Sequence, residues 1–465
     1  MTRVETISAA GPPRFRHGAA PAGRLLQAPV LPTLLRLSVP NAVSLCAVTA
    51  ISIAETGYVG RLGTDALAAI ALVLPVFMLL QMMAIGAMGG GITAAVARAL
   101  GAGDTARATA LVRHAVVIAG CAGLTFTLVI IGFGRPIFHW LGGDGAVLDA
   151  ALAYARVAFA AAGAIWLTNA LASVLRGTGD MIVPSATFVG IALLQITVGG
   201  ALGLGLGPLP RLGMAGVACG VLVAYTTAAI GLALYLASGR ARLRFDWRLA
   251  PLDPRLFGEI LRVGAPACLA ACQAIGALLV LAHLAAQLST DALAGYGIGA
   301  RLELLMMPLT FAFGVSATPM VGAAIGAGDV ARARRAAWTA GLLGFGATGL
   351  LGLIVAAVPS LWVALFSDDA AVVVAANTYL HLAGPAFAGF GLAHCLYYAS
   401  QGSGRIVPMV LAQSFRLLVV VAGTMWITRA GLSLSRLVLL AAAGLLAYGL
   451  GAIVAMSTSR WDARP

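Results

Sequence analysis

One acidic residue, Glu55, lies within the first long apolar stretch of the chain, LLRLSVPNAVSLCAVTAISIAETGYVGRLGTD at residues 34–65. A charged carboxylate at membrane depth costs at least ~2.5–3.5 kcal/mol, so such a group is normally paired, protonated or functional. Because burial disfavours the charged form of a carboxylate, Glu55 is a candidate proton carrier. The structural alternative is a packing acid that is hydrogen-bonded to a neighbouring helix.

Three other polar residues share a helical face with Glu55. Asn41, Ser44 and Ser52 precede it by 14, 11 and 3 residues, close to whole turns of a helix. We expect Pro40 at the start of this helix, where its missing N–H does no harm. An otherwise apolar helix with one polar stripe is expected to face a protein interior or a water-filled cavity.

A second acid, Glu303, also lies well inside an apolar stretch and follows Arg301 by two residues. Residues two apart on a helix do not face each other, so each needs another partner. A structural ion pair, cavity lining and a coupling role stay open for Glu303. His283, His381 and His394 could relay protons, but such histidines are more often hydrogen-bonded packing residues.

The elements that position these residues are transmembrane helices. The chain has 465 residues, is 61% hydrophobic and 10% charged, and has a mean hydropathy of +0.98, which predicts a polytopic membrane protein. Its apolar runs are long and uninterrupted, which favours helices over a barrel. The net charge of +13 comes from arginines between apolar runs, so it indicates a positive-inside bias rather than nucleic-acid binding. The six cysteines lie in apolar runs and suggest no metal site, and we expect no cofactor.

Twelve apolar stretches are long enough to span a bilayer. They lie at about 34–58, 67–97, 111–134, 150–175, 183–207, 213–237, 258–288, 292–325, 335–358, 373–400, 406–428 and 433–456. We therefore divide the chain into an N-terminal tail (1–33), of which residues 1–30 are expected to be disordered, an N-lobe (34–237), a linker (238–257), a C-lobe (258–456) and a C-terminal tail (457–465). Arginines concentrate in the N-terminal tail and after the even-numbered stretches, which predicts cytoplasmic termini and a cytoplasmic linker.

The two halves repeat one another. LRLSVP (35–40) matches LRVGAP (261–266) and TDALA (64–68) recurs at 290–294, both at an offset of 226. ALGAGDTARA (99–108) matches AIGAGDVARA (324–333), and RGTG (176–179) matches QGSG (401–404), both at 225. Because each repeat has an even number of spans, two six-helix bundles related by a pseudo-twofold axis along the membrane normal are expected. This all-α architecture is typical of alternating-access transporters.

The motifs ETGYVGRLGTDALA, ARALGAGDTARA, LRGTGDMIVP, LGMAGVACG and AIGAGDVARA together resemble the multidrug and toxic compound extrusion (MATE) transporters over roughly residues 31–456, nearer the DinF-type branch. The resemblance places the family's first-span carboxylate on Glu55 and its fourth-span Asn on Asn169. The span-5 Asn and Asp of the DinF-type branch fall on Gln195 and Gly199, so the second acid of that site is missing. Where another branch carries C-lobe acids, this chain has Gln273, Ala274, Phe390 and Gly391.

The resemblance implies a secondary active antiporter of the cytoplasmic (inner) membrane that exports amphipathic, mostly cationic organic compounds in exchange for protons. Glu55 would be its proton-coupling residue. The substrate cavity would be lined by Asn41, Ser52, Asn169, Gln195, Gln273 and Glu303. Sodium coupling and a lipid-linked saccharide flippase stay open as alternatives, whereas a membrane-embedded enzyme would need clustered acids, histidines or metal ligands. We expect a monomer.

Overall fold

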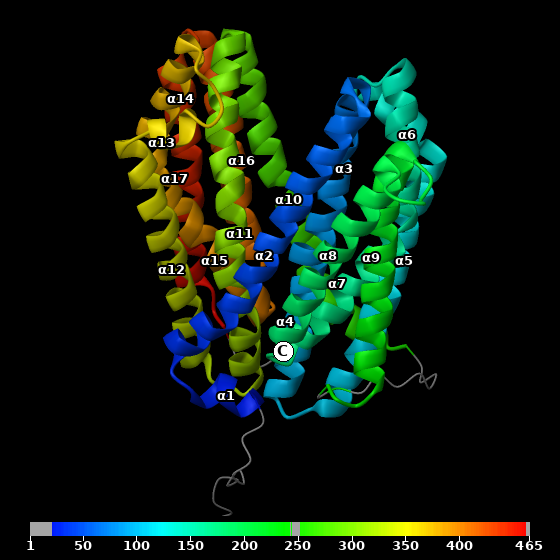
Figure 1. The fold of residues 1–465 in the computed structure, drawn as a ribbon. Coiled ribbons are helices and arrows are strands. Elements are labelled where there is room, and N and C mark those ends of the chain that lie inside the picture. The colour runs from blue at the N-terminus through cyan, green and yellow to red at the C-terminus, as the bar shows by residue number, and fades with distance from the viewer. Residues whose placement is uncertain (1–20, 242, 244–251, 462–465) are drawn as a thin grey trace, which may run out of the picture.

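The computed structural model describes residues 21–241, 243 and 252–461, and this part of the chain folds into helices and their connections (Figure 1). The first half contains α1 (Pro21–Gln27), α2 (Val30–Leu62), α3 (Thr64–Met82), the π-helix η1 (Met83–Met88), α4 (Gly89–Gly101), α5 (Thr105–Trp140), α6 (Gly145–Ala160), α7 (Ala162–Gly177), α8 (Ile182–Leu204) and α9 (Gly213–Ala237). The second half contains α10 (Pro254–Leu288), α11 (Thr290–Gly326), α12 (Val330–Ala357), α13 (Ser360–Val363), α14 (Ala370–Ala383), the 3-10 helix η2 (Gly384–Ala386), α15 (Phe387–Ser403), α16 (Val407–Ala430) and α17 (Leu434–Thr458).

The expected number of spans is confirmed. Eleven helices of the described residues are long and apolar enough to cross a membrane, and the number is twelve when α6 and α7, bent by 43° at their junction, are counted as one span. The second span is continued through the π-turn η1, and the tenth consists of α14 and α15 joined by η2.

Three local expectations were wrong. Residues 21–27 of the tail that we expected to be disordered form α1, and residues 1–20 lie outside the described residues. Helix α2 begins at Val30, so Pro40 lies inside it rather than at its start. Helix α10 begins at Pro254, inside the stretch assigned to the linker, of which residues 242 and 244–251 are not described.

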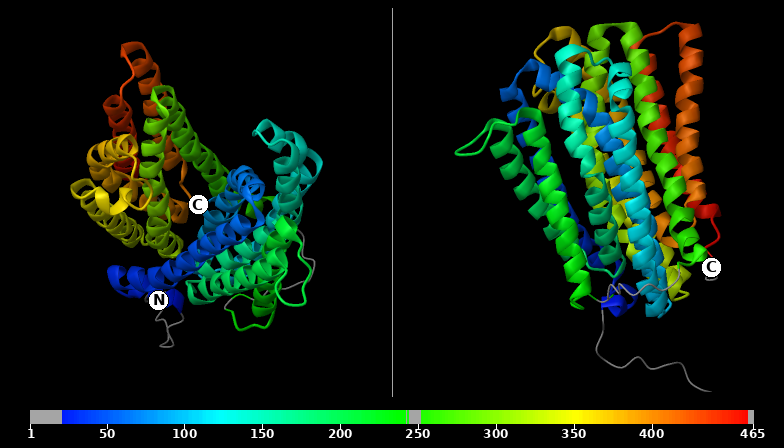
Figure 2. Two further views of the ribbon diagram at one scale, coloured as in Figure 1. Left: turned by 45° about the horizontal axis from the view of Figure 1, so that its top comes forward. Right: turned by 90° about the vertical axis from the view of Figure 1, so that its right-hand side faces the viewer.

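The helices form two bundles, which Figure 1 and the two views of Figure 2 show side by side. One apolar core is built mainly from α2–α9 and the other mainly from α10–α17. We call these bundles the N-lobe and the C-lobe. The described chain starts and finishes at one end of the molecule, the termini-bearing end, and the bundles diverge toward the other end (Figure 1).

The internal repeat is present in the hydrogen bonds as well as in the sequence. In the N-lobe the hydroxyl of Thr93 donates to the carbonyl of Ser173 over 2.9 Å. In the C-lobe the hydroxyl of Thr318 donates to the carbonyl of Tyr398 over the same 2.9 Å. Both partners are shifted by 225 residues, so the same bond joins the second and fourth spans of each lobe.

The lobes pack closely where α4 meets α11. A Cβ atom at Gly101 would lie 2.1 Å from the carbonyl oxygen of Ala323, and one at Gly326 would lie 2.1 Å from that of Arg98. Only glycine permits such an approach, because any side chain would push the two backbones apart. This packing fixes how the N-lobe and the C-lobe meet in the structure.

Candidate functional site

The side chain of Glu55 lies on α2 where that helix packs against α8. The amide nitrogen of Gln195 on α8 donates to Oε1 of Glu55 over 2.8 Å. Gln195 is buried and Glu55 is partly exposed. The structure therefore brings together the first-span carboxylate and the fifth-span amide, two of the residues that the sequence selected.

The apolar core of the N-lobe, on which this pair lies, contains several tyrosines. The ring of Tyr58, one turn beyond Glu55, lies against Gly200 of α8, where a Cβ atom would come within 2.8 Å of its Cζ. Tyr154 of α6 and Tyr225 of α9 are both buried in this core. The hydroxyl of Tyr225 in turn accepts a 2.8 Å hydrogen bond from Gln81 of α3. The expectations from sequence included none of these tyrosines, because their positions follow from the packing of several helices.

Among the described residues Glu55 has no basic side chain as an ion-pair partner, and its side chain is hydrogen-bonded to the neutral amide of Gln195. A neutral partner does not fix the carboxylate in its charged form as an arginine would. The arrangement can therefore accommodate either protonation state of Glu55.

The absence of a second acid at Gly199 has a steric reason. A Cβ atom at Gly199 would lie 3.0 Å from the carbonyl oxygen of Val217 on α9. On the facing helix, a Cβ atom at Gly220 would lie 2.6 Å from the carbonyl oxygen of Gln195. Helices α8 and α9 pack backbone to backbone here, which leaves little room for a carboxylate.

The other N-lobe candidates do not join the pair. Asn169 is buried on α7 and donates to the carbonyl of Ile165 in its own helix over 2.9 Å. Asn41 is buried between the lobes, where its amide donates to the hydroxyl of Ser316 on α11 over 3.1 Å. Ser52 is exposed on α2. The polar stripe of α2 thus divides into a part that contacts the C-lobe and a part near Glu55.

In the C-lobe, Glu303 of α11 pairs with Arg416 of α16. The distance from Nη2 of Arg416 to Oε1 of Glu303 is 2.6 Å, and each side chain is only 2% exposed. Arg301 instead lies over the ring of Phe366 at 5.1 Å. The expectation that Glu303 and Arg301 have separate partners is confirmed. The partner of Glu303 was missed, although a lone arginine in the eleventh apolar stretch was a signal for it.

The remaining C-lobe candidates make packing hydrogen bonds. Gln273 of α10 donates to the hydroxyl of Ser414 on α16 over 2.8 Å. Nδ1 of His394 lies 2.6 Å from the hydroxyl of Thr310, and its ring stacks on Phe390. Each of these bonds ties two C-lobe helices together.

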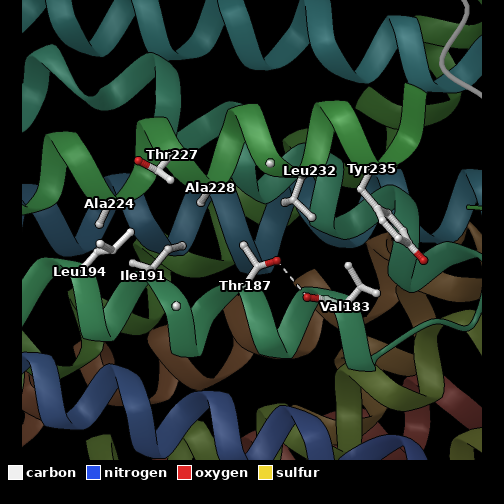
Figure 3. Close-up of a pocket in the computed structure, with 11 residues that line it drawn as sticks. Val183, Thr187, Ile191, Leu194, Ala224, Thr227, Ala228, Leu232 and Tyr235 are labelled. Atoms are coloured by element: carbon white, nitrogen blue, oxygen red, sulfur yellow. Dashed lines mark hydrogen bonds between the residues drawn. The ribbon is translucent and has the colours of Figure 1, made fainter. Parts of the chain in front are cut away.

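A groove of about 320 Å³ runs between α8 and α9 (Figure 3). Its lining is apolar apart from Thr187, Thr227 and Tyr235, and Thr187 donates to the carbonyl of Val183 in its own helix. It contains neither an acid nor a base, so it lacks the chemistry of the Glu55 site. Within the described ranges, no three His, Cys, Asp or Glu side chains gather in a way that could hold a metal ion.

Comparison with protein families gives a match to the model named MatE over residues 40–201 and a second over residues 266–426. The chain belongs to the MatE family. This is a family of transporters, not of enzymes, and the double match coincides with the two halves of the internal repeat. The comparison supports membership of the family and does not single out a branch within it.

Several curated proteins are similar to this MatE chain. It is 28% identical over 338 residues to the "FAD transporter" of Shewanella oneidensis, covering 69% of this chain and 70% of that one. It is 32% identical over 346 residues to the "Probable multidrug resistance protein NorM" of Deinococcus radiodurans, covering 70% of each. It is 25% identical over 359 residues to the "Probable multidrug resistance protein YoeA" of Bacillus subtilis, covering 76% of this chain and 77% of that one.

Solved structures share the fold. The "Outward-facing conformation of a multidrug resistance MATE family transporter of the MOP superfamily" superposes with a TM-score of 0.84 at 23% identity, covering 93% of this chain and 96% of that one. The "Crystal structure of MATE in the bent conformation" gives a TM-score of 0.86 at 23% identity, covering 94% and 96%. The fold of this MatE chain is therefore that of known MATE transporters.

Proposed function

We propose that the protein is a secondary active antiporter, nearer the DinF-type branch, that exports amphipathic, mostly cationic organic compounds in exchange for protons. Glu55 is its protonation switch. The observation that carries the proposal is the 2.8 Å hydrogen bond that the carboxylate of Glu55 accepts from the neutral Gln195. Two similar proteins that are named as probable multidrug resistance proteins support the substrate class.

In the proposed cycle, ionised Glu55 attracts a cation into a cavity of the N-lobe. Two opposite unit charges 4 Å apart attract by roughly 4 kcal/mol at an effective dielectric constant of about 20, before the cost of desolvation. Protonation of Glu55 removes this attraction and releases the compound. Reorientation of the two lobes then carries the proton to the other side of the membrane.

The orientation is part of the proposal. We place the protein in the inner membrane. Because the arginines follow the positive-inside pattern, both termini and the linker lie on the cytoplasmic side. The termini-bearing end, where α4 and α11 pack together, then faces the cytoplasm, and the divergent end faces outward. Reporter fusions at residue 247 and at the C-terminus should report a cytoplasmic location, and periplasmic activity would contradict the assignment.

Protons are the proposed coupling ion because the C-lobe positions that could form a sodium site hold no carboxylate. A hard cation needs several oxygen ligands, usually including carboxylates. Gln273, Ala274, Phe390 and Gly391 supply no acid. The one acid described deep in the C-lobe, Glu303, is neutralised by Arg416.

A second candidate is the export of an anionic dinucleotide, because one similar protein is named an FAD transporter. Such a substrate would need free cationic side chains in the cavity. Arg416, the arginine buried deep in the C-lobe, is paired with Glu303. This pairing favours the cationic class, and it counts equally against a lipid-linked saccharide flippase.

Uptake into everted membrane vesicles tests the proposal. A fluorescent organic cation should accumulate when a proton gradient is imposed and should stop accumulating when a protonophore collapses that gradient. Accumulation that persists under a sodium gradient alone would contradict proton coupling. Vesicles that accumulate FAD and not the cation would replace the proposed substrate class.

A further inference from the structure

Two arginines at equivalent positions of the repeat, Arg107 and Arg332, each contact the start of the other half's first long helix or the segment just before it. Both follow a turn with the sequence GAGD, in which an aspartate caps the next helix. Asp104 accepts from the backbone N–H of Arg107, and Asp329 accepts from that of Arg332, each over 2.8 Å. The cap fixes the first turn of α5 or α12 and so directs the arginine that follows. The Glu55 site makes no use of this motif.

Arg107 reaches from α5 of the N-lobe to α10, the first long helix of the C-lobe. Its Nη2 and Nε lie 2.6 and 3.1 Å from Oε1 of Glu259. The two side chains are 32% and 23% exposed, so solvent screens the pair.

Arg332 reaches from α12 of the C-lobe to the chain just before α2, the first long helix of the N-lobe. Its Nε donates to the carbonyl of Leu25 over 2.9 Å, and its Nη2 donates to the carbonyl of Ala28. The residue that corresponds to Glu259 at an offset of 226 is Thr33, which has no carboxylate. Because no acid is present there, the guanidinium bonds to main-chain carbonyls instead.

These carbonyls belong to a segment, residues 21–28, that we call the strap. Leu25 of the strap is 4% exposed and belongs to the apolar core of the C-lobe. Its Cδ1 also lies 3.0 Å from where a Cβ atom at Gly179 would be, in the turn that precedes α8 of the N-lobe. The strap therefore contacts both lobes, and it leads directly into the helix that carries Glu55.

The first residues of α2 and α10, the first long helices of the two lobes, each pack into the core of the opposite lobe. Leu34 of α2 is fully buried in the core of the C-lobe, whereas Ile260 of α10 is fully buried in that of the N-lobe. The two residues are equivalent at an offset of 226. Each lobe thus holds the start of the other lobe's first helix, and an arginine fastens each contact.

We propose that Arg332 with the strap, and Arg107 with Glu259, form a two-point latch that holds the lobes together at the termini-bearing end. The latch stabilises the arrangement described here relative to one in which this end is open, a state that alternating access requires. Two hydrogen bonds from a buried guanidinium outweigh one screened ion pair, so Arg332 is the stronger point. The latch depends neither on the coupling ion nor on the role of Glu55.

Thiol labelling of a residue between the lobes tests the latch. Ser316 is buried against Asn41 of α2, and Ser316→Cys, with the six native cysteines replaced, gives one thiol that is protected while this end is closed. When opening is fast and labelling is slow, the labelling rate by a water-soluble maleimide is proportional to the open population. The measurement uses the full chain in lipid nanodiscs and needs no substrate.

Arg332→Met should raise the labelling rate about tenfold or more, since hydrogen bonds to charged groups contribute roughly 1.5–3 kcal/mol. Arg107→Met should raise the labelling rate less, by about 1.5-fold to fivefold, because solvent screens the pair. Arg334→Met is the matched control, because Arg334 on the same helix also donates to a main-chain carbonyl, that of Ser459 at the end of α17, over 2.6 Å. The control should leave the rate unchanged.

Two more variants keep the test decisive if Arg332→Met does not fold. Leu25→Ala loosens the strap while both arginines stay, and it should also raise the rate. Arg332→Lys keeps the charge and should fall between the wild type and Arg332→Met. Spin labels at Ile182 and Val407, the first residues of α8 and α16, should report a longer distance in the faster-labelling variants. Rates for Leu25→Ala and Arg107→Met that equal the wild-type rate, or an equal rise in Arg334→Met, would overturn the latch.

Discussion

The two lobes share a fold and treat their buried acids in opposite ways. In the N-lobe, Glu55 of the first span accepts one hydrogen bond from a neutral amide on the fifth span. In the C-lobe, Glu303 of the second span forms an ion pair with Arg416 on the fifth span. The carboxylate of Glu55 thus has a neutral partner, whereas that of Glu303 has a cationic one.

The repeat shows that neither arrangement was copied to the other lobe. At the offsets of 226 and 225, Glu55 and Gln195 correspond to Leu281 and Val420, which are both buried. Likewise Glu303 and Arg416 correspond to Phe77 and Ile191. The duplicated scaffold therefore carries one acid with a neutral partner and one acid with a cationic partner. We propose on this basis that proton coupling belongs to the N-lobe.

The largest effect should come from breaking the ion pair of the C-lobe. Arg416→Met leaves the carboxylate of Glu303 buried without a partner, and the loss should be about 3–5 kcal/mol of stability. The double variant Glu303→Met with Arg416→Met should recover most of that loss. Thermal unfolding in detergent measures both. A double variant as unstable as Arg416→Met would contradict this prediction, because the loss of stability would then not come from the unpaired charge of Glu303.

Adding the missing acid of the N-lobe should be the next most damaging change. Gly199→Asp forces a side chain against the backbone of α9, and overpacking of this kind costs about 1–3 kcal/mol before the cost of the charge. Gly199→Ala is the matched control for the steric part and should lose less. A stable Gly199→Asp protein would contradict the account of why this chain has a single N-lobe carboxylate.

A smaller effect is expected from the partner of Glu55. Gln195→Leu removes the 2.8 Å hydrogen bond while keeping much of the side-chain volume. Stability should change by about 1 kcal/mol, and proton-driven efflux should fall severalfold because Glu55 is no longer oriented. Thr348→Val, which removes a buried hydrogen bond to the carbonyl of Phe387 in the C-lobe, is the control and should leave efflux nearly intact. Equal losses of efflux in the two variants would remove the contrast between the lobes.

The sequence predicted the features that depend on local composition and on repetition. The twelve spans follow from apolar length, and the two bundles follow from motifs such as TDALA that recur at a constant offset. Glu55 stood out because an acid in an apolar stretch is costly. Each of these predictions depends on the composition of one segment or on the comparison of two repeated segments.

Features that depend on contacts between distant segments could not be predicted in the same way. The pairing of Glu303 with Arg416 joins residues 113 apart, and helical periodicity does not encode which helices adjoin. Pro40 was misplaced because the apolar pattern understated how far α2 extends toward its start. The helix α1 was missed because its stability comes from the packing of Leu25 on both lobes rather than from its own seven residues.

The most direct test of the central claim compares Glu55→Gln with Glu55→Asp at matched expression. Glu55→Gln mimics the protonated form, so the protein should still insert while energised efflux nearly vanishes, because the amide can neither attract a cation nor cycle a proton. Glu55→Asp keeps a titratable carboxylate and should retain substantial efflux. If Glu55 were only a packing acid, Gln would be tolerated and the shorter Asp would be worse. Near-wild-type efflux by Glu55→Gln would contradict the role of Glu55 as the switch.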